Sequence, residues 1–407
     1  MQGLAEPKQL LLRLLDPASR VDPYPLYREI RERGPIAMPE SHFAVFGTFA
    51  QCDEILRHPA SANDRLKSTL AQRAVAAGQP ARPFGAPGFL FLDPPDHTRL
   101  RRLAQQAFAP KVVRALEPEI VALVDGLLDA VRPGTEFDAL TGLAYPLPVA
   151  VICRLLGVPL SDEPQFSAAS GLLAQGLDPF ITFTGQVSDS FAERLEAGRW
   201  LRGYLRDLVA RRRAEPREDL ISALIAAEED GDQLTEDEIV ATCNLLLIAG
   251  HETTVNLIAN AILAMLREPR HWAALSADPT RAAAIVEETL RYDPPVQLSS
   301  RVATTDMTIG GVTVPAGDIM MVMMAAAQRD PDLYDDPDTF DPGRGAIRHL
   351  AFGLGPHFCL GAPLARLEAT IALSALTARF PHARLAGEPA YKPNVTLRGM
   401  SSLPLTV

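Results

Sequence analysis

A glycine-rich segment near the C-terminus contains a single cysteine. Residues 352–361 read FGLGPHFCLG, and a helical pattern follows at about 363–379. Glycine lets a backbone approach a bulky flat group closely. The helix dipole and free N–H groups favour the thiolate of a cysteine at a helix N-terminus, and the thiolate is the form that ligates a metal. We therefore predict that Cys359 is a metal ligand, the alternative being a buried and inert thiol.

A second group of polar residues lies within a long apolar stretch. Residues 249–254 read AGHETT. Gly250 weakens a helix locally, and a hydroxyl that bonds a carbonyl one turn back bends it further. An acid and an alcohol, Glu252 and Thr253, are adjacent in this segment. Val255 replaces the second histidine of a zinc-binding HExxH motif, so a zinc protease is excluded.

Charged pairs recur at helical spacing elsewhere in the chain. Glu288 and Arg291 are three residues apart and would share a helix face, although most such pairs are weak surface bridges. His97 and Arg101 lie one helical turn apart. Arg301 and His357 are two further basic residues, in other parts of the chain.

Composition excludes several classes of protein. The 407 residues include 39 Lys and Arg against 50 Asp and Glu, a net charge of −11, which argues against a nucleic-acid-binding protein. Four widely spaced cysteines indicate neither disulfides nor zinc. We find no signal peptide and no run of the ~18 uncharged apolar residues that a spanning helix needs. We therefore expect a cytoplasmic protein without a membrane anchor.

The expected fold is mainly α with small β-sheets, in one large domain over residues 1–407. Helices are predicted at 96–108, with Asp96 as its cap, and at 118–130, 188–213, 219–229, 235–266, 280–292 and 363–379. Thr235 and Glu238 form a capping box at the start of the longest helix. Strands are predicted at 43–46 and in a hairpin at 308–314 that turns at Gly310 and Gly311.

These motifs, in this order, resemble those of the cytochrome P450 haem-thiolate monooxygenases in their bacterial soluble form. The resemblance spans nearly the whole chain and includes FDPGR at 340–344. It implies a helix-rich domain with small β-rich regions near both ends, and a haem b whose iron is bound by the Cys359 thiolate. The resemblance implies haem contacts from Phe352, Gly353, Ala249 and Gly250, and contacts to the haem propionates from His97, Arg101, Arg301 and His357. It also implies proton relay by Glu252 and Thr253, and scaffolding by Glu288, Arg291 and Arg344.

The resemblance also implies an activity. A haem-thiolate monooxygenase inserts one oxygen atom of O₂ into a lipophilic small molecule, by hydroxylation or epoxidation. The alternatives are a peroxide-driven peroxygenase, a redox-neutral haem-thiolate enzyme, and a non-catalytic haem carrier or sensor. Because no flavin or nicotinamide motif is present, electrons would come from an external ferredoxin and an NAD(P)H-linked ferredoxin reductase.

Two further sets of residues follow from the resemblance. Arginines that could bind an acidic ferredoxin are Arg102, Arg348 and Arg366. Residues in the substrate-facing segments, mostly apolar, are Phe89, Leu90, Phe180, Leu245, Ile248, Leu298, Ser299 and Met400.

Overall fold

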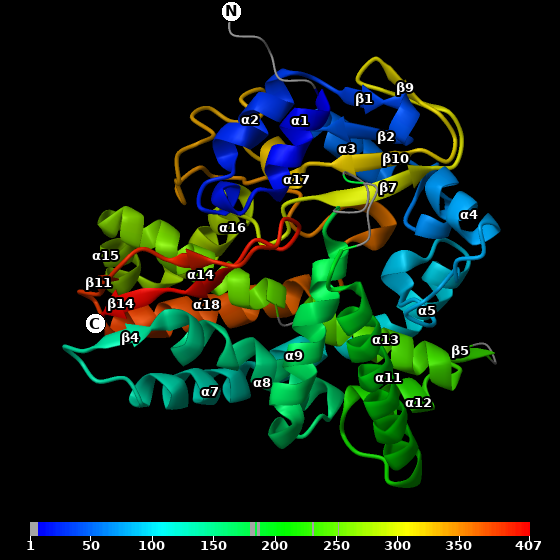
Figure 1. Cartoon of the computed structure of the whole chain (residues 1–407). Helices are drawn as coiled ribbons and strands as arrows, with labels where there is room; N and C mark the ends of the chain where they lie inside the picture. The colour runs from blue at the N-terminus through cyan, green and yellow to red at the C-terminus, as the bar shows by residue number, and fades with distance from the viewer. Residues whose placement is uncertain (1–6, 180–183, 185–187, 230–231, 251) are drawn as a thin grey trace, which may run out of the picture.

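The computed structural model describes residues 7–179, 184, 188–229, 232–250 and 252–407. Helices form most of the molecule, and the largest sheet lies at one end of it, with α1, α2 and α3 beside it (Figure 1). The predicted fold class, mainly α with small sheets, is therefore confirmed.

The α-helices account for nearly half of the described residues, and short 3-10 and π segments bring the helical share above half. They are α1 Pro7–Leu12, α2 Tyr24–Glu32, α3 Phe49–Arg57, α4 Thr69–Ala76, α5 Asp96–Gln105, α6 Pro110–Ala115, α7 Glu117–Asp129, α8 Pro146–Leu156, α9 Glu163–Ala174, α11 Phe191–Ala214, α12 Leu220–Ala226, α13 Glu236–Gly250, α14 Glu252–Arg267, α15 Pro269–Ala277, α16 Ala282–Tyr292, α17 Met324–Ala327 and α18 Ala362–Arg379.

The strands are short and form several sheets. They are β1 Ile36–Met38, β2 Phe43–Phe46, β3 Ser61–Ala62, β4 Glu136–Asp138, β5 Glu228–Glu229, β6 Asp232–Gln233, β7 Ser299–Ala303, β8 Met307–Ile309, β9 Val312–Val314, β10 Ile319–Val322, β11 Arg384–Leu385, β12 Ala390–Tyr391, β13 Met400–Ser402 and β14 Pro404–Thr406. The largest sheet has the order β1-β2-β10-β7-β3. β10 pairs in parallel with β2, so residues from both halves of the chain share one sheet.

The predicted long helix corresponds to α13 and α14. Thr235 accepts a hydrogen bond from the Glu238 N–H, and the Thr235 N–H donates to the Glu238 carboxylate, which is the predicted capping box. The stretch Glu236–Arg267 is long and apolar enough to cross a membrane, contrary to our expectation from the sequence. However, 76% of its apolar window is buried inside the protein, so its apolar character is that of a core helix.

Local signals predict most element boundaries well. Gly310 and Gly311 turn the β8–β9 hairpin with φ values of +55° and +80°, which glycine adopts without strain. Asp219 caps α12 by accepting a hydrogen bond from the Ser222 N–H at 2.8 Å. The expectation that Asp96 caps α5 is wrong, because Pro95 occupies the N-cap position and Asp96 is the first helical residue.

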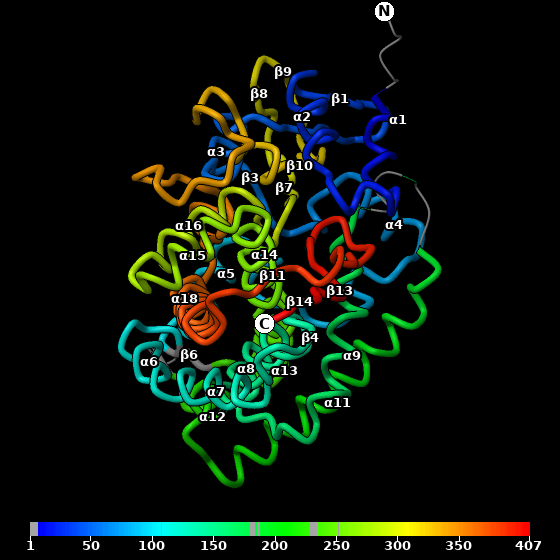
Figure 2. The backbone as a smooth tube through the Cα atoms, turned by 90° about the vertical axis from the view of Figure 1, so that its left-hand side faces the viewer, coloured from blue at the N-terminus to red at the C-terminus, as the bar shows by residue number. Residues whose placement is uncertain are grey.

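α18 is the helix around which much of the core packs. It contacts α7, α14, α15 and α16, and it lies between α7 and the α15–α16 pair (Figure 2). Its residues Ala369, Ala372, Leu373 and Leu376 are completely buried. The segment that contains Cys359 leads directly into α18, so the packed core determines where that segment lies.

The end of α8 provides a test of backbone geometry. Gly157 has φ +76°, and a β-carbon there would overlap with the Asp219 carboxylate. We expect Gly157→Ala to lower the free energy of unfolding by about 2–5 kcal/mol, because a left-handed conformation and overpacking are both unfavourable for alanine. Gly134 has φ +79° and nothing within 4 Å of the added carbon, so Gly134→Ala should cost only about 1–2 kcal/mol. Urea denaturation followed by circular dichroism measures both; equal losses would contradict the proposed overlap.

Candidate active site

The loop before α18 is shaped by two glycines and one backbone hydrogen bond. Gly353 and Gly355 have φ values of +65° and +67°, which an L side chain rarely adopts. A β-carbon at Gly355 would also lie 2.9 Å from the Leu56 carbonyl oxygen. The Cys359 N–H donates to the Phe352 carbonyl at 2.8 Å and closes the loop. The glycines are therefore required for the loop to return and place Cys359 just ahead of α18.

The Cys359 side chain is accessible although protein surrounds it. It is the one exposed cysteine of the four. Burial raises the pKa of its thiol, whereas the N–H groups of Gly361 and Ala362 and the charges of Arg101 and Arg366 lower that pKa. Accessibility combined with desolvation is what we expect of a side chain that faces an internal space. The helix N-terminus and the two arginines would stabilise a thiolate there.

Four basic side chains gather beside this loop. The rings of His97 and His357 lie 4.1 Å apart, and Arg101 donates to the Phe358 carbonyl. The positive charges of His97, Arg301 and Arg101 all lower the pKa of His357, after burial as the main cause, to about 3. The structure thus brings together His97, Arg101, Arg301 and His357, which come from three distant parts of the sequence.

Among the described residues, this basic cluster makes no ion pair with a carboxylate, although the charge of Asp93 acts to raise the pKa of His97, Arg301 and His357. Both ring nitrogens of His97 and the Nδ1 atom of His357 are buried without a hydrogen-bond partner. Arg301 is 6% exposed and donates to Ser299 Oγ and the Ser300 carbonyl, and burial lowers its pKa to about 10. Within the described part of the chain, no carboxylate forms an ion pair with Arg101 or Arg301. Buried cations need an anionic partner, so this cluster fits a dicarboxylate such as the two propionates of haem.

The central helix exposes a short patch at the AGHETT motif. Ala249 is exposed, and Ile248 and Gly250 are partly exposed, although most of the helix is buried. Thr253 Oγ1 donates to the Ala249 carbonyl at 2.7 Å, and Thr254 Oγ1 donates to the Gly250 carbonyl at 3.2 Å. α14, which begins at Glu252, packs against α18. The two motifs therefore precede helices that are packed together.

Glu252 has a partner that the sequence did not indicate. It is 8% exposed, and its Oε1 atom lies 2.6 Å from Lys392 Nζ. Lys392 follows β12 in the C-terminal region, 140 residues further along the chain. No sequence pattern links the two residues, because only the fold brings the C-terminal strands against the central helix.

Glu288, Arg291 and Arg344 form a buried electrostatic network. Glu288 and Arg291 are completely buried and make two parallel contacts of 2.7 Å, and Arg344 Nε lies 3.3 Å from Glu288. The remaining donors of the two arginines bind backbone carbonyls. Those carbonyls belong to Gln328, Pro337, Thr339, Asp335 and Asp336. The three residues thus hold the segment 328–344 in place; Glu288 and Arg291 have no exposed surface, and Arg344 is mostly buried.

The three arginines expected to bind a ferredoxin have different environments. Arg366 lies 3.0 Å from Glu287 and 4.5 Å from the Phe352 ring, so its charge is already paired. Arg348 is exposed and stacks on Phe49 at 5.1 Å, and Arg102 is partly buried. Arg348 is therefore the best placed of the three to meet a partner.

The predicted substrate-facing residues also divide into groups. Leu90, Ile248 and Ser299 keep partial exposure, although Ser299 Oγ already accepts from Arg301. Phe89, Leu245, Leu298 and Met400 are buried; Phe89 packs on His97, Leu298 lies in the N-terminal core, and Met400 is 0% exposed. Leu298 and Met400 thus retain almost no surface for a substrate, because strand packing covers them. Phe180 lies outside the described residues.

The Glu288 network gives a stability prediction. We expect Glu288→Gln to lower the free energy of unfolding by about 3–5 kcal/mol, because Arg291 would stay buried without a full counter-charge. Glu29→Gln is the matched control: its ion pair with Arg13, at 2.7 Å, is exposed and should contribute less than about 1 kcal/mol. Urea denaturation of the purified variants measures both. If the two variants unfold at the same urea concentration, the Glu288 network does not make this contribution to the free energy of unfolding.

Comparison with known proteins agrees with this geometry. The family model for cytochrome P450 matches residues 56–397. The ligand-free structure of Mycobacterium smegmatis CYP164A2 is 65% identical, covers 98% of this chain and 100% of its own, and superimposes with a TM-score of 0.94. The same protein has been solved with econazole bound, at 64% identity and the same TM-score, covering 98% of this chain and 100% of its own.

Characterised relatives match over nearly the full length. A vitamin D(3) 25-hydroxylase of Pseudonocardia autotrophica is 41% identical over 95% of this chain and 94% of its own length. The cytochrome P450 monooxygenase PikC of Streptomyces venezuelae is 39% identical over 98% of this chain and 95% of its own. The family carries haem bound through an axial cysteine thiolate, and the unpaired basic cluster beside Cys359 fits that group. This chain therefore belongs to the cytochrome P450 family of haem monooxygenases.

Proposed function

We propose that this protein inserts one oxygen atom of O₂ into a lipophilic small molecule, with electrons from an external ferredoxin. The observation that carries the proposal is the accessible, desolvated Cys359 beside four basic groups that form no ion pair with a carboxylate of the described residues. Haem, when bound there, supplies the iron at which dioxygen is reduced. The work of the chain is to hold this group, deliver protons and exclude water.

Cys359 would bind the iron, and the basic cluster would bind the propionates. The N–H groups of Gly361 and Ala362 point at the sulfur and would moderate its electron donation. His97, Arg101, Arg301 and His357 offer charge-assisted donors for two carboxylates. Phe352, Gly353, Ala249 and Gly250 would lie against the flat faces of the ring, where side chains must be small or planar.

Thr253 and Glu252 would deliver protons to the oxygen-binding side. The Thr253 hydroxyl donates to the Ala249 carbonyl, so it lies on the exposed patch of the central helix. Glu252, the residue before Thr253, forms an ion pair with Lys392. Release of this ion pair would free the Glu252 carboxylate to take part in proton transfer. Intact Glu252 and Thr253 favour the O₂ pathway over a peroxide-driven one.

The substrate we propose is an apolar molecule of steroid, terpenoid, macrolide or fatty-acid type. Leu90 and Ile248 are the apolar residues of the predicted lining that keep accessible surface. The relative named as a vitamin D(3) 25-hydroxylase makes vitamin D₃ a suitable first test compound. By the similarity to CYP164A2, we also propose that econazole binds at the haem site.

The electron donor we propose is a ferredoxin reduced by an NAD(P)H-linked ferredoxin reductase. The exposed Arg348 supports this choice, because acidic ferredoxins bind basic surfaces. We further propose that residues 1–407 form a single domain located in the cytoplasm. The five-stranded sheet supports one domain, since β2 and β10 come from opposite halves of the chain and pair directly.

The thiolate assignment is tested by a carbon-monoxide difference spectrum. We expect Cys359→Ser to lose the band typical of haem-thiolate proteins, because a serine hydroxyl does not replace the thiolate. Cys243→Ala is the control, since Cys243 is buried and burial raises the pKa of its thiol to about 12, which keeps it protonated. Retention of the thiolate band by Cys359→Ser would refute the ligand assignment.

The proton-delivery role is tested by measuring how closely NADH consumption is coupled to product formation. In turnover with ferredoxin, reductase and NADH, we expect Thr253→Ala to bind substrate within twofold of the parent but to divert most electrons to hydrogen peroxide. Thr254→Ala removes a hydroxyl with a similar backbone contact one residue further on, and should stay coupled. The measurement is product and peroxide formed per NADH consumed. Full coupling in Thr253→Ala would contradict the role.

A further inference from the structure

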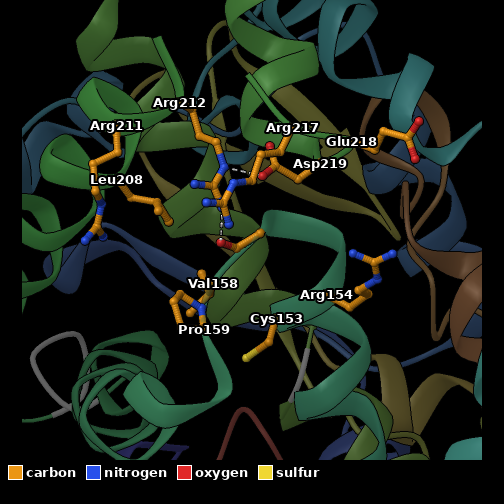
Figure 3. A pocket seen from close by; sticks show the side chains of 11 residues that line it. Cys153, Arg154, Val158, Pro159, Leu208, Arg211, Arg212, Arg217, Glu218 and Asp219 are labelled. Atoms are coloured by element: carbon orange, nitrogen blue, oxygen red, sulfur yellow. Dashed lines mark hydrogen bonds and ion pairs between the residues drawn. The ribbon is translucent and has the colours of Figure 1, made fainter. Parts of the chain in front are cut away.

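A second pocket lies away from the candidate active site. It has a volume of about 680 Å³ and is bounded by α8, α11 and the loop that precedes α12 (Figure 3). That volume is within the range of small-molecule sites, about 300–1,000 Å³. Its lining residues are Cys153, Arg154, Gly157, Val158, Pro159, Leu208, Arg211, Arg212, Arg217, Glu218 and Asp219. None of them belongs to the residues assigned to haem, protons or substrate.

The inner wall of the pocket is rigid and electrically neutral. Arg212 and Asp219 are both buried and form an ion pair, and Arg212 also donates to the Gly157 carbonyl at 2.7 Å. Asp219 is held further by the Ser222 N–H at 2.8 Å. Figure 3 shows Arg212 and Asp219 joined at the centre of the pocket. Because these two charges neutralise each other, neither is available for a ligand.

Three other arginines on the pocket are exposed and weakly engaged. Arg154 lies 3.4 Å from Glu119, and Arg217 lies 3.4 Å from Glu215; both pairs are solvent-exposed. Exposed pairs at such distances contribute little free energy and exchange partners easily. Arg211 forms no ion pair with any residue that the structure describes. In Figure 3, Arg211 and Arg154 lie on either side of the Arg212–Asp219 pair.

The remaining lining is apolar apart from one carboxylate. Val158, Leu208 and Cys153 are buried core side chains that contribute carbon and sulfur surface. Burial raises the pKa of Cys153 to about 12, so this thiol stays uncharged. Glu218 is exposed and is the one acidic lining residue outside the Arg212–Asp219 ion pair. Among the lining residues outside the Arg212–Asp219 pair, three arginines face one carboxylate, while Glu119 and Glu215, the exposed partners of Arg154 and Arg217, lie outside the lining.

We propose that this pocket binds an amphipathic anion, with an aliphatic body on the apolar wall and a carboxylate or phosphate headgroup held by Arg211 and Arg217. Charge-assisted hydrogen bonds from arginine suit both headgroups. Burial of the aliphatic body supplies the rest of the binding free energy. Glu218 repels additional negative charge, so a single headgroup fits better than two.

The first experiment separates this pocket from the haem site. The holoenzyme is saturated with econazole, as judged by the Soret band, and is then titrated by isothermal calorimetry with dodecanoate or dodecyl phosphate below their micelle concentrations. We expect about one equivalent to bind without a change in the Soret band. Dodecanol and inorganic phosphate should each bind at least tenfold more weakly. Absence of binding, or equal binding of dodecanol, would overturn the proposal. The two anions show whether carboxylate or phosphate is preferred.

The second experiment locates the site. The double variant Arg211→Glu/Arg217→Glu should weaken binding of the preferred anion at least tenfold. Arg73→Glu/Arg199→Glu makes the same change in net charge at exposed arginines of α4 and α11 outside the pocket, and should stay within twofold of the parent. Haem spectra of both variants report whether the fold is intact. Equal weakening in both variants would show a general charge effect, and no weakening in the first would place the anion elsewhere; either result refutes the assignment.

Discussion

A carboxylate without any exposed surface organises the region that carries the cysteine. Glu288 on α16 accepts two hydrogen bonds from Arg291, one from Arg344 and one from the Asp341 N–H. A buried charge is tolerated only when such partners satisfy it. The arginines that neutralise Glu288 then hold the carbonyls of the segment 328–344. The path of the chain toward Cys359 therefore follows from the need to satisfy one buried charge.

The basic cluster next to Cys359 shows the opposite condition. Around Glu288 each of the three charged side chains has hydrogen-bond partners within the protein, whereas His97, His357 and Arg301 keep buried nitrogen atoms or charges that no carboxylate of the described chain pairs with. A protein can keep such a cluster only if another group supplies the negative charge. A cluster of charged residues whose hydrogen-bond partners all lie within the protein indicates a structural role. A cluster of basic residues without such partners indicates a site for a bound anionic group. This difference distinguishes the residues that we propose to bind haem from those that we propose to be structural.

The central helix links the two sides of the site to the C-terminal strands. Thr253 and Thr254 bond carbonyls one turn back, which is the arrangement that bends a helix. Lys392, near the C-terminus, holds Glu252 at the same turn. The Ile152 side chain of α8 would be 3.2 Å from a β-carbon at Gly250. Cys153, the residue that follows Ile152 in α8, lines the second pocket. A single helix thus separates the two sites.

The amino-acid sequence alone determined features whose contacts lie within a turn or two of chain. The Thr235 capping box, the Gly310–Gly311 turn, the Glu288–Arg291 pair and the Cys359 loop are all local, so residue type and spacing define them. Tertiary structure alone decided which distant residues meet. The contact of His97 with His357, the Lys392 partner of Glu252 and the burial of Met400 depend on how helices and strands pack. The spacing of apolar residues indicates which face of a helix or strand is apolar, but it does not indicate which other element packs against that face.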